Sequence, residues 1–415
     1  MVQSYYTGIS GLQNSSIGID MVANNIANIS TTGYRAYKTE FASIFEDALS
    51  SARVGNSNSI GIGVRVQTAA MTQAQGALAL SDRSSDVAIE GDGWFGVQSN
   101  GDIEYTRDGT FAFDVNSDLV TTDGFYVLGT KGSNISKDNV LTKKNAEIKL
   151  SSIKEQEKLS FPTTLTYPPE PSTKAKFMAN LGVGYDPITV GTTVIDPQNN
   201  KNYLQLKFVK NPTQTSLEAQ YSVTATTQSL DGSTIYDTKT GSASFDVSGA
   251  LISTSLNTID NNGAMVSIDL GNGYNGITAI DIPVVSGSGT ADGIVGGDLV
   301  GYSVNGNAEV IATFTNGIQS SVGKIAVYHF TNEQGLKRIN GTRFQQSVNS
   351  GEAQFWKDAD GKPINGSNVF NFRLESSNVS LSFGLTELII MQCAYNANSK
   401  SITTSDQMIQ KAIKM

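Results

Sequence analysis

The sequence predicts an α+β multidomain protein with paired, coiled-coil-like N- and C-terminal helices and nested all-β domains between them. Three observations lead to this prediction. Apolar residues recur with a helical period at both ends of the chain, and no proline occurs before Pro162 or after Pro363. Between the ends the period changes to two, and turn residues separate short apolar runs. Glycine contributes 41 of 415 residues, which is about a tenth of the chain, whereas the average is about 7%. This excess favours turn-rich β structure.

The N-terminal segment predicts a helix from about Tyr5 to Asn28. Positions on one face step by four and three, which is the spacing of a heptad repeat. Gly18 weakens the helix a little, and residues 31–33 (Thr-Thr-Gly) end it. The resulting seam consists of Tyr5, Ile9, Leu12, Ser16, Ile19, Ala23 and Ile26.

The C-terminal segment shows nearly the same spacing, with more polar interruptions. Ser377 or Asn378 is expected to cap the start of this helix. Its seam consists of Leu381, Leu385, Leu388, Gln392, Tyr395, Lys400 or Ser399, Ile402, Ile409 and Ile413.

Each apolar stripe is narrow and must be buried against another apolar surface. The stripe of matching pitch is the one on the helix at the other end of the chain. We therefore expect the two termini to pair; packing of each helix on an ordinary domain core is the alternative. The other helix faces favour pairing and contact with neighbouring copies, because uncharged amides and hydroxyls can hydrogen-bond there without desolvating a charge. These faces include Asn24, Asn25, Asn28, Asn396 and Asn398.

The middle of the chain predicts a series of β-hairpins. Asp108-Gly109, Asp123-Gly124 and Asn316-Gly317 each stand between alternating apolar runs, which is a strong turn signal. Four of the nine prolines fall in residues 162–171, a semi-rigid stretch that suits a domain junction. The predicted division is a terminal helical domain (1–32 and 378–415), a connecting region (33–74 and 356–377), an inner β domain (75–160 and 301–355) and an inserted outer β domain (161–300).

Composition excludes several classes of function. The 29 basic and 38 acidic side chains give a net charge of −9, which argues against nucleic-acid binding. One cysteine, Cys393, allows no intrachain disulfide, and one histidine, His329, argues against histidine-based metal sites. We expect Cys393 to be a small packing residue of the C-terminal helix and His329 to have a structural role in a strand.

Motifs for catalysis or ligand binding are weak. Residues 271–276 match a dinucleotide fingerprint by letters, but a strand rather than a helix follows them. Asp114, Asn116 and Asp118 start like a calcium loop, yet Leu119 stands where a glycine must turn, so an Asx-type turn is the better interpretation. We therefore expect no enzyme, and no catalytic, cofactor-binding or metal site.

The N-terminus lacks the basic and apolar regions of a cleavable signal peptide. No apolar run approaches the roughly 18 residues that span a bilayer, so no membrane insertion is expected. A cytoplasmic protein and a protein exported without such a signal both fit these observations.

Five motifs resemble the bacterial flagellar rod, hook and hook-associated proteins. They occur in the order in which that family carries them, and together they cover roughly half the chain. The length and the long middle region favour the hook branch over the shorter rod branch. Ser380, Cys393 and Trp94 depart from the usual residues of the family. The motifs are residues 24–34, 85–95, 105–111, 375–379 and 392–398.

This resemblance implies a subunit that polymerises with copies of itself into a helical tube, the joint between motor and filament. The paired helices would line a central channel, the β domains would lie outside, and the terminal helices would be disordered before assembly. It also implies export by the flagellar type III apparatus without signal cleavage, and contacts with distal rod, hook cap and hook–filament junction proteins. The residues expected to carry self-assembly are Ile9, Leu12, Ile19, Asn24, Asn25, Ile26, Asn28, Leu381, Leu385, Leu388, Tyr395, Asn398, Ile402 and Ile409.

Three alternatives remain open at this point. The first is a rigid rod or adaptor subunit of the same organelle. The second is a secreted β-rich adhesin or polysaccharide-active enzyme, and the third is a cytoplasmic structural protein.

Overall fold

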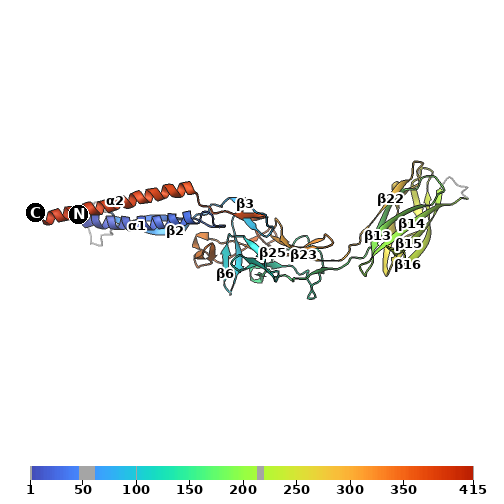
Figure 1. Cartoon of the computed structure of the whole chain (residues 1–415), viewed down its shortest axis with the longest axis horizontal. Coiled ribbons are helices and arrows are strands. Elements are labelled where there is room, and N and C mark those ends of the chain that lie inside the picture. The colour runs from blue at the N-terminus through green and yellow to red at the C-terminus, as the bar shows by residue number, and fades with distance from the viewer. Residues whose placement is uncertain (1, 46–60, 100, 213–218, 415) are drawn as a thin grey trace.

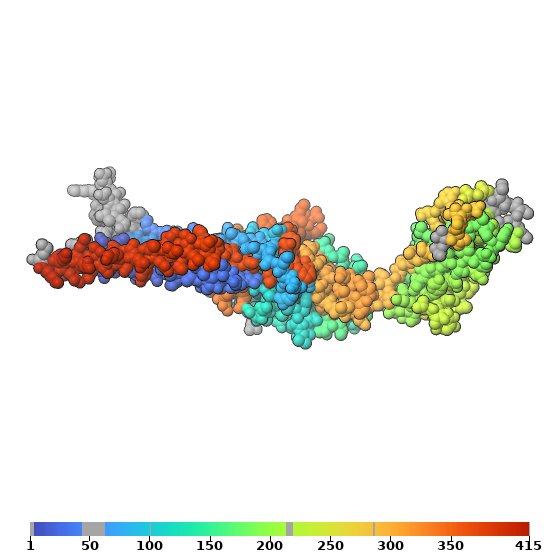
Figure 2. Space-filling view, turned by 45° about the horizontal axis from the view of Figure 1, so that its top comes forward, coloured from blue at the N-terminus to red at the C-terminus, as the bar shows by residue number. Residues whose placement is uncertain are grey.

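The computed structural model describes residues 2–45, 61–99, 101–212 and 219–414. The molecule is elongated, and both chain ends lie at the same end of it (Figure 1). A pair of helices occupies that end, a first β region follows, and a second β region forms the far end (Figures 1 and 2). The predicted combination of two terminal helices and several β domains is therefore confirmed.

The two helices, α1 (Val2–Ala27) and α2 (Leu381–Ile413), lie side by side along the molecule (Figure 1). Ser380 stands at the N-cap of α2, so the prediction of Ser377 or Asn378 at that place is wrong. The Asn378 side chain is used elsewhere: it accepts a hydrogen bond from the Ala36 N–H at 2.7 Å. A residue that holds two distant segments together is not available to cap the helix.

A long antiparallel strand pair, referred to below as the hairpin, packs along α1 within the stretch predicted as a connecting region. It consists of β1 (Tyr37–Phe45) and β2 (Gly61–Met71). The Val64 N–H donates to Ser10 Oγ at 3.0 Å, and Asn14 Nδ2 donates to the Val64 carbonyl at 2.7 Å. These polar side chains of α1 therefore bind the hairpin backbone.

The inner β region is built on a 13-stranded sheet whose central path runs β11-β23-β24-β25-β9-β5-β6-β28-β27. Two hydrophobic cores fill it, one around Phe95, Phe111 and Phe314 and one around Trp94 and Tyr328. The strands are β5 (Trp94–Gln98), β6 (Ile103–Thr106), β7 (Phe111–Phe113), β8 (Leu119–Thr121), β9 (Tyr126–Lys131), β10 (Glu157–Lys158), β11 (Thr166–Tyr167), β23 (Gly297–Val304), β24 (Glu309–Phe314), β25 (Gln319–Ile325), β26 (Val327–Tyr328), β27 (Lys337–Asn340) and β28 (Arg343–Gln345).

Three short strand pairs lie outside this sheet. β3 pairs with β32, β4 pairs with β31, and β29 pairs with β30. Two 3-10 turns, Ile153–Glu155 and Glu333–Gly335, complete the region. The bounds of these strands are β3 (Leu78–Leu80), β4 (Val87–Glu90), β29 (Trp356–Lys357), β30 (Pro363–Ile364), β31 (Asn368–Asn371) and β32 (Arg373–Glu375).

Two of the three predicted hairpin turns are confirmed. Gly124 has φ +80° between the paired strands β8 and β9, and Gly317 has φ +79° between β24 and β25. The hairpin predicted at Asp108-Gly109 is wrong, because β6 pairs with β5 and β28 whereas β7 pairs with β8. Gly109 instead allows two backbone segments to cross, since a Cβ there would lie 1.8 Å from the Val87 carbonyl oxygen.

The outer β region is a two-sheet sandwich with a core of its own, to which Phe177, Phe208 and Phe245 contribute. One sheet has the order β18-β19-β12-β21-β20 with β22 beside β12, and the other has the order β13 to β17. Its strands are β12 (Lys174–Asn180), β13 (Ile188–Ile195), β14 (Lys201–Lys210), β15 (Ala219–Ser229), β16 (Ile235–Phe245), β17 (Leu251–Thr254), β18 (Thr258–Asn261), β19 (Ala264–Asp269), β20 (Gly271–Asn272), β21 (Asn275–Thr278) and β22 (Val285–Ala291).

The two β regions are connected by two antiparallel chain segments. Glu170 and Ile294 exchange two backbone hydrogen bonds of 2.9 Å, and Asp292 Oδ1 accepts a bond of 2.8 Å from the Thr173 N–H. Only the first two residues of the strand predicted after residues 271–276 are confirmed, because β21 begins at Asn275 and ends at Thr278. The turn at Asp114 is of the predicted Asx type.

Candidate functional site

The face of α1 that is buried in the single chain is a row of small and polar residues. Its positions step by three and four, so they form one continuous stripe along the helix. This stripe lies one residue away from the predicted seam, which is a rotation of about 100° around the helix. Its members are Gly8, Gly11, Ser15, Gly18, Val22 and Asn25.

Glycines in this stripe let α2 come close to α1. A Cβ on Gly11 would lie 2.6 Å from the Asn398 side-chain amide, and one on Gly8 would lie 2.8 Å from Ile402. On the other helix, a Cβ on Gly384 would lie 3.2 Å from Ile26. These distances are shorter than ordinary van der Waals contact, so larger residues would push the helices apart.

The structure thus brings Ile26, Asn398 and Ile402 of the predicted set into the helix contact. It leaves Leu381 and Leu385 exposed, at 48% and 45% of their surface, so their predicted place in the seam between the two helices is wrong. The remaining apolar members are half-buried: Ile9, Leu12, Ile19, Leu388, Tyr395 and Ile409.

Asn25 serves contacts within the chain, which corrects its predicted place on a free polar face, whereas Asn24 is exposed as predicted and Asn28 follows the end of α1. Asn25 is buried; its Nδ2 donates to the Tyr37 carbonyl at 2.6 Å and its Oδ1 accepts from the Tyr37 N–H at 3.1 Å. The Tyr34 hydroxyl donates to Asn24 Oδ1 at 3.1 Å, and Asn28 Nδ2 donates to the Asn24 carbonyl at 2.9 Å. They fix the corner between α1 and the hairpin.

The outward face of α2 carries exposed apolar side chains. Only one charged residue, Glu387, occurs between positions 381 and 399 of this helix. Cys393 is also exposed, so its predicted role as a packing residue is wrong. A helix face of this composition would be unusual against water. Its exposed apolar residues in this stretch are Leu381, Phe383, Leu385, Ile389 and Ile390.

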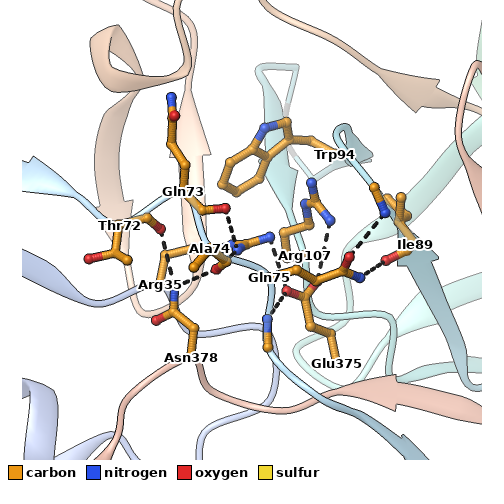
Figure 3. Close-up of polar contacts among 12 residues, drawn as sticks. Arg35, Thr72, Gln73, Ala74, Gln75, Ile89, Trp94, Arg107, Glu375 and Asn378 are labelled. Atoms are coloured by element: carbon orange, nitrogen blue, oxygen red, sulfur yellow. Dashed lines mark hydrogen bonds and ion pairs between the residues drawn. The ribbon is translucent and has the colours of Figure 1, made fainter. Parts of the chain in front are cut away.

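A buried ionic cluster joins the helices to the inner β region (Figure 3). The Glu375 carboxylate lies 3.0 Å from the Arg35 guanidinium and 3.3 Å from that of Arg107. All three side chains are at most 4% exposed. Arg35 follows α1, Arg107 follows β6 and Glu375 precedes α2, so three distant segments meet at one carboxylate.

Backbone contacts surround this cluster (Figure 3). The Gly76 N–H donates to Glu375 Oε1 at 3.0 Å, and the Gly33 N–H donates to the Glu375 carbonyl at 2.7 Å. Arg35 also donates to the carbonyls of Gln73 and Ala74. The segment that leads from the hairpin into the β region is therefore bound to both arginine and glutamate.

Two guanidinium groups share one carboxylate, so the cluster carries one excess positive charge. Burial lowers the pKa of Arg107, and the nearby Glu375 carboxylate opposes that shift. The Trp94 ring lies 5.5 Å from the Arg107 guanidinium and supplies a cation–π contact. Removal of Glu375 would leave two buried cations without their shared ion-pair partner.

Sequence reasoning missed these three charged residues. Each lies in or directly beside a motif of the family resemblance: Arg35 follows residues 24–34, Arg107 lies in 105–111 and Glu375 begins 375–379. Glu375 offered a signal, because it is the one charged residue of motif 375–379 and a buried charge needs a partner. Arg107 stands beside Asp108 in its motif and offered no such signal.

Within the described ranges there is no group of three or more His, Cys, Asp or Glu side chains that could hold a metal ion. His329 is buried, its Nε2 lies 2.6 Å from the Asn365 carbonyl oxygen, and burial lowers its pKa. No helix in the described part of the chain combines the length and apolar character needed to cross a bilayer.

Three family models match the chain, and they cover the parts that meet at the ionic cluster. Residues 6–35 match "Flagella basal body rod protein", and residues 88–158 match "Flagellar hook protein FlgE/F/G D1 domain". Residues 372–415 match "Flagellar basal body rod FlgEFG protein C-terminal". Arg35, Arg107 and Glu375 each lie within a different one of these matches.

Relatives that match over their full length are described as flagellar hook protein FlgE. The chain is 26% identical to the flagellar hook protein FlgE of Borreliella burgdorferi, with 100% of both chains covered. It is 26% identical to that of Salmonella typhimurium and 27% to that of Escherichia coli, over 99% of this chain and 100% of the relatives. The crystal structure of Helicobacter pylori FlgE2 has a similar fold, with a TM-score of 0.50, 17% identity, and 72% of this chain and 100% of that chain covered.

The fold and the site define an elongated structural protein whose adjacent terminal helices are anchored to β domains by a buried ionic cluster. The chain is similar to bacterial flagellar hook and rod proteins at both ends and in the inner β region, where the three family models match it.

Proposed function

We propose that this chain is the structural subunit of the bacterial flagellar hook, the flexible joint between motor and filament. Full-length similarity to hook proteins, which includes the outer β region, is the observation that carries this proposal. The exposed apolar face of α2 supports assembly with copies of the same chain, because association would remove that face from water. A head-to-tail contact that does not close into a ring produces a helical tube.

In this tube the helices form the inner wall around a channel, and they pair there in a coiled-coil-like manner. The self-assembly residues are the half-buried apolar members of the predicted set together with Leu381 and Leu385. The β regions lie outside, with the outer sandwich at the surface. The domain division predicted from the sequence is part of this proposal.

The ionic cluster transmits torque between the wall and the β domains. Because Arg35 and Arg107 come from different segments and share one buried carboxylate, the helices and the inner β region cannot separate without breaking both ion pairs. Bending takes place further out. Apolar outer interfaces would resist sliding at about 25 cal/mol per Å² exposed, whereas polar ones exchange hydrogen bonds with water.

The partners are the other parts of the same organelle. The tube would continue from the distal rod, grow beneath a hook cap and end at the hook–filament junction proteins. Subunits would reach its tip through the flagellar type III export apparatus without loss of a signal peptide, with terminal helices that order on assembly.

Electron microscopy of the purified, concentrated full-length chain tests the proposal. We expect short curved tubes, and removal of residues 1–30 should leave a folded β core that forms none. Straight, stiff tubes would support a rod subunit instead. Particles that remain single at every concentration would overturn assembly, and hydrolase screening and glycan arrays would then test the adhesin or enzyme alternative.

A further inference from the structure

Phe372 is a bulky residue in a backbone conformation that suits glycine. Its φ angle is +54°, in the left-handed region where a side chain with a Cβ is strained. Five other non-glycine residues in the described ranges have positive φ, and they are serine, alanine or asparagine in turns. Those residues are Ser117, Asn139, Asn199, Asn262 and Ala308.

The chain bends at Phe372, and this bend accounts for the positive φ angle. The bend does not require a phenylalanine side chain at that position. Phe372 stands between β31, which pairs with β4, and β32, which pairs with β3. Its carbonyl accepts a hydrogen bond of 2.8 Å from the Ser81 N–H. A glycine would make the same bend and the same bond without strain, so the phenylalanine is not required by the fold.

The Phe372 ring also adds little to the interior. It is 43% exposed and belongs to none of the three hydrophobic cores of the described chain. Leu80, whose strand partner Arg373 is the next residue, is 82% exposed. Two large apolar side chains are thus presented to the outside at one bend, and strain retained at such a place indicates a contact outside the chain.

The position of this pair indicates what covers it. β32 leads directly to α2, and Leu381 and Phe383 at the start of α2 are exposed as well. In Figure 2 the red surface of α2 passes into the light-blue surface around β3 on the same face of the molecule. Exposed apolar side chains therefore occur both at the bend and at the start of α2, a few residues further along the chain.

We propose that Phe372 and Leu80 form an apolar knob that binds a second copy of this chain, as an extension of the contact made by the outward face of α2. This inference rests on the proposed function. In a head-to-tail polymer the knob would insert into a different surface of the next copy. The strained backbone holds the ring outward before assembly, so little ordering is needed when the contact forms.

The test compares Phe372→Gly, Phe372→Ala and Phe372→Tyr in the full-length chain. Seeded assembly is measured by sedimentation, as the concentration of subunit left in solution at steady state. Gly and Ala should raise this concentration about fivefold, which corresponds to losing the burial of half a phenylalanine side chain. Tyr, which keeps the ring, should assemble like the parent. Ser117→Gly, at another left-handed position without an apolar ring, is the matched control and should leave assembly unchanged.

Thermal unfolding of the unassembled chain provides the second readout. At an ordinary position alanine is more stabilising than glycine, and at a left-handed position the order is reversed. Phe372→Gly should therefore melt above Phe372→Ala. Parent-like assembly of both variants, or a higher melting temperature for the alanine variant, would overturn the inference. Failure of the parent chain to form tubes would refute the proposed function itself, so the two failures are distinguishable.

Discussion

The Arg107 guanidinium lies 3.3 Å from the Glu375 carboxylate, although 268 positions separate the two residues in the chain. Arg35 binds the other oxygen of the same carboxylate at 3.0 Å. One side chain thus connects the end of the first helix, the inner sheet and the start of the second helix. Its loss should affect the molecule more than the loss of any exposed ion pair.

Glu375→Gln should destabilise the folded chain by about 3 kcal/mol or more, because two buried arginines would keep their charge without a partner. Denaturant unfolding of the unassembled protein measures this. Glu352→Gln, which changes an exposed glutamate, serves as the control and should have almost no effect. A loss below about 1 kcal/mol for Glu375→Gln would contradict the assigned role.

Gly11→Ala should separate the two helices, since the new Cβ would lie 2.6 Å from the Asn398 amide. Overpacking of this kind costs about 1–3 kcal/mol, and we expect fewer and shorter tubes by electron microscopy. Adding Asn398→Ala should restore assembly by making room for the methyl group. Gly184→Ala, at an exposed glycine with no neighbour within 4 Å, is the matched control. Normal tubes from Gly11→Ala would show that the helix contact differs in the polymer.

Leu385→Asp separates folding from assembly. Leu385 is 45% exposed in the single chain, so circular dichroism and melting temperature should remain those of the parent. In the tube the same side chain would be buried, and an unpaired charge there costs several kcal/mol, so tubes should be absent. Leu230→Asp, at an exposed leucine of the outer β region, should assemble normally. If Leu385→Asp forms tubes, the outward face of α2 takes no part in the contact between subunits.

The outer β region should lose stability in acid through Asp196. Burial would raise the pKa of this carboxyl, but hydrogen bonds from Asn262, Asn200 and Asn202 outweigh burial and hold its pKa below the ordinary value. A carboxyl with a lowered folded-state pKa contributes stability above its unfolded pKa of about 3.9, and that contribution disappears as the pH falls through the folded value.

Asp196→Asn should therefore reduce the melting temperature at neutral pH and flatten its decline below about pH 4. Melting curves followed at several pH values check both effects. Asp186→Asn, at an exposed aspartate of the same region, should retain the parent's acid dependence. An unchanged decline in Asp196→Asn would show that other carboxylates govern acid stability.

Deletion of residues 174–291 should leave the inner β region folded. Thr173 and Asp292 are already joined by a 2.8 Å hydrogen bond, so ligating them directly demands little rearrangement. The truncated chain should still form tubes, with altered curvature or stiffness visible in micrographs. Complete loss of assembly would show that contacts essential for assembly lie in the outer β region.

The local pattern of residues was sufficient for the two helices, the change to β structure and the turns at Asp123-Gly124 and Asn316-Gly317. Helical period, alternation and turn chemistry act over a few residues, so they can be recognised without knowing the fold. The family resemblance and the polar, low-charge composition also pointed to assembly rather than to catalysis.

The helix contact, the strand pairing around Gly109 and the ionic cluster depend on contacts between residues that are far apart in the sequence. The side of α1 that meets α2 depends on Gly8 and Gly11, because close approach of two helices favours small residues over a stripe of larger apolar ones. Asp108-Gly109 resembles a hairpin turn, yet its neighbours pair with strands far along the chain. Glu375 is one glutamate among many until folding places two arginines beside it, since a buried charge acquires its importance only from the partners that the tertiary structure supplies.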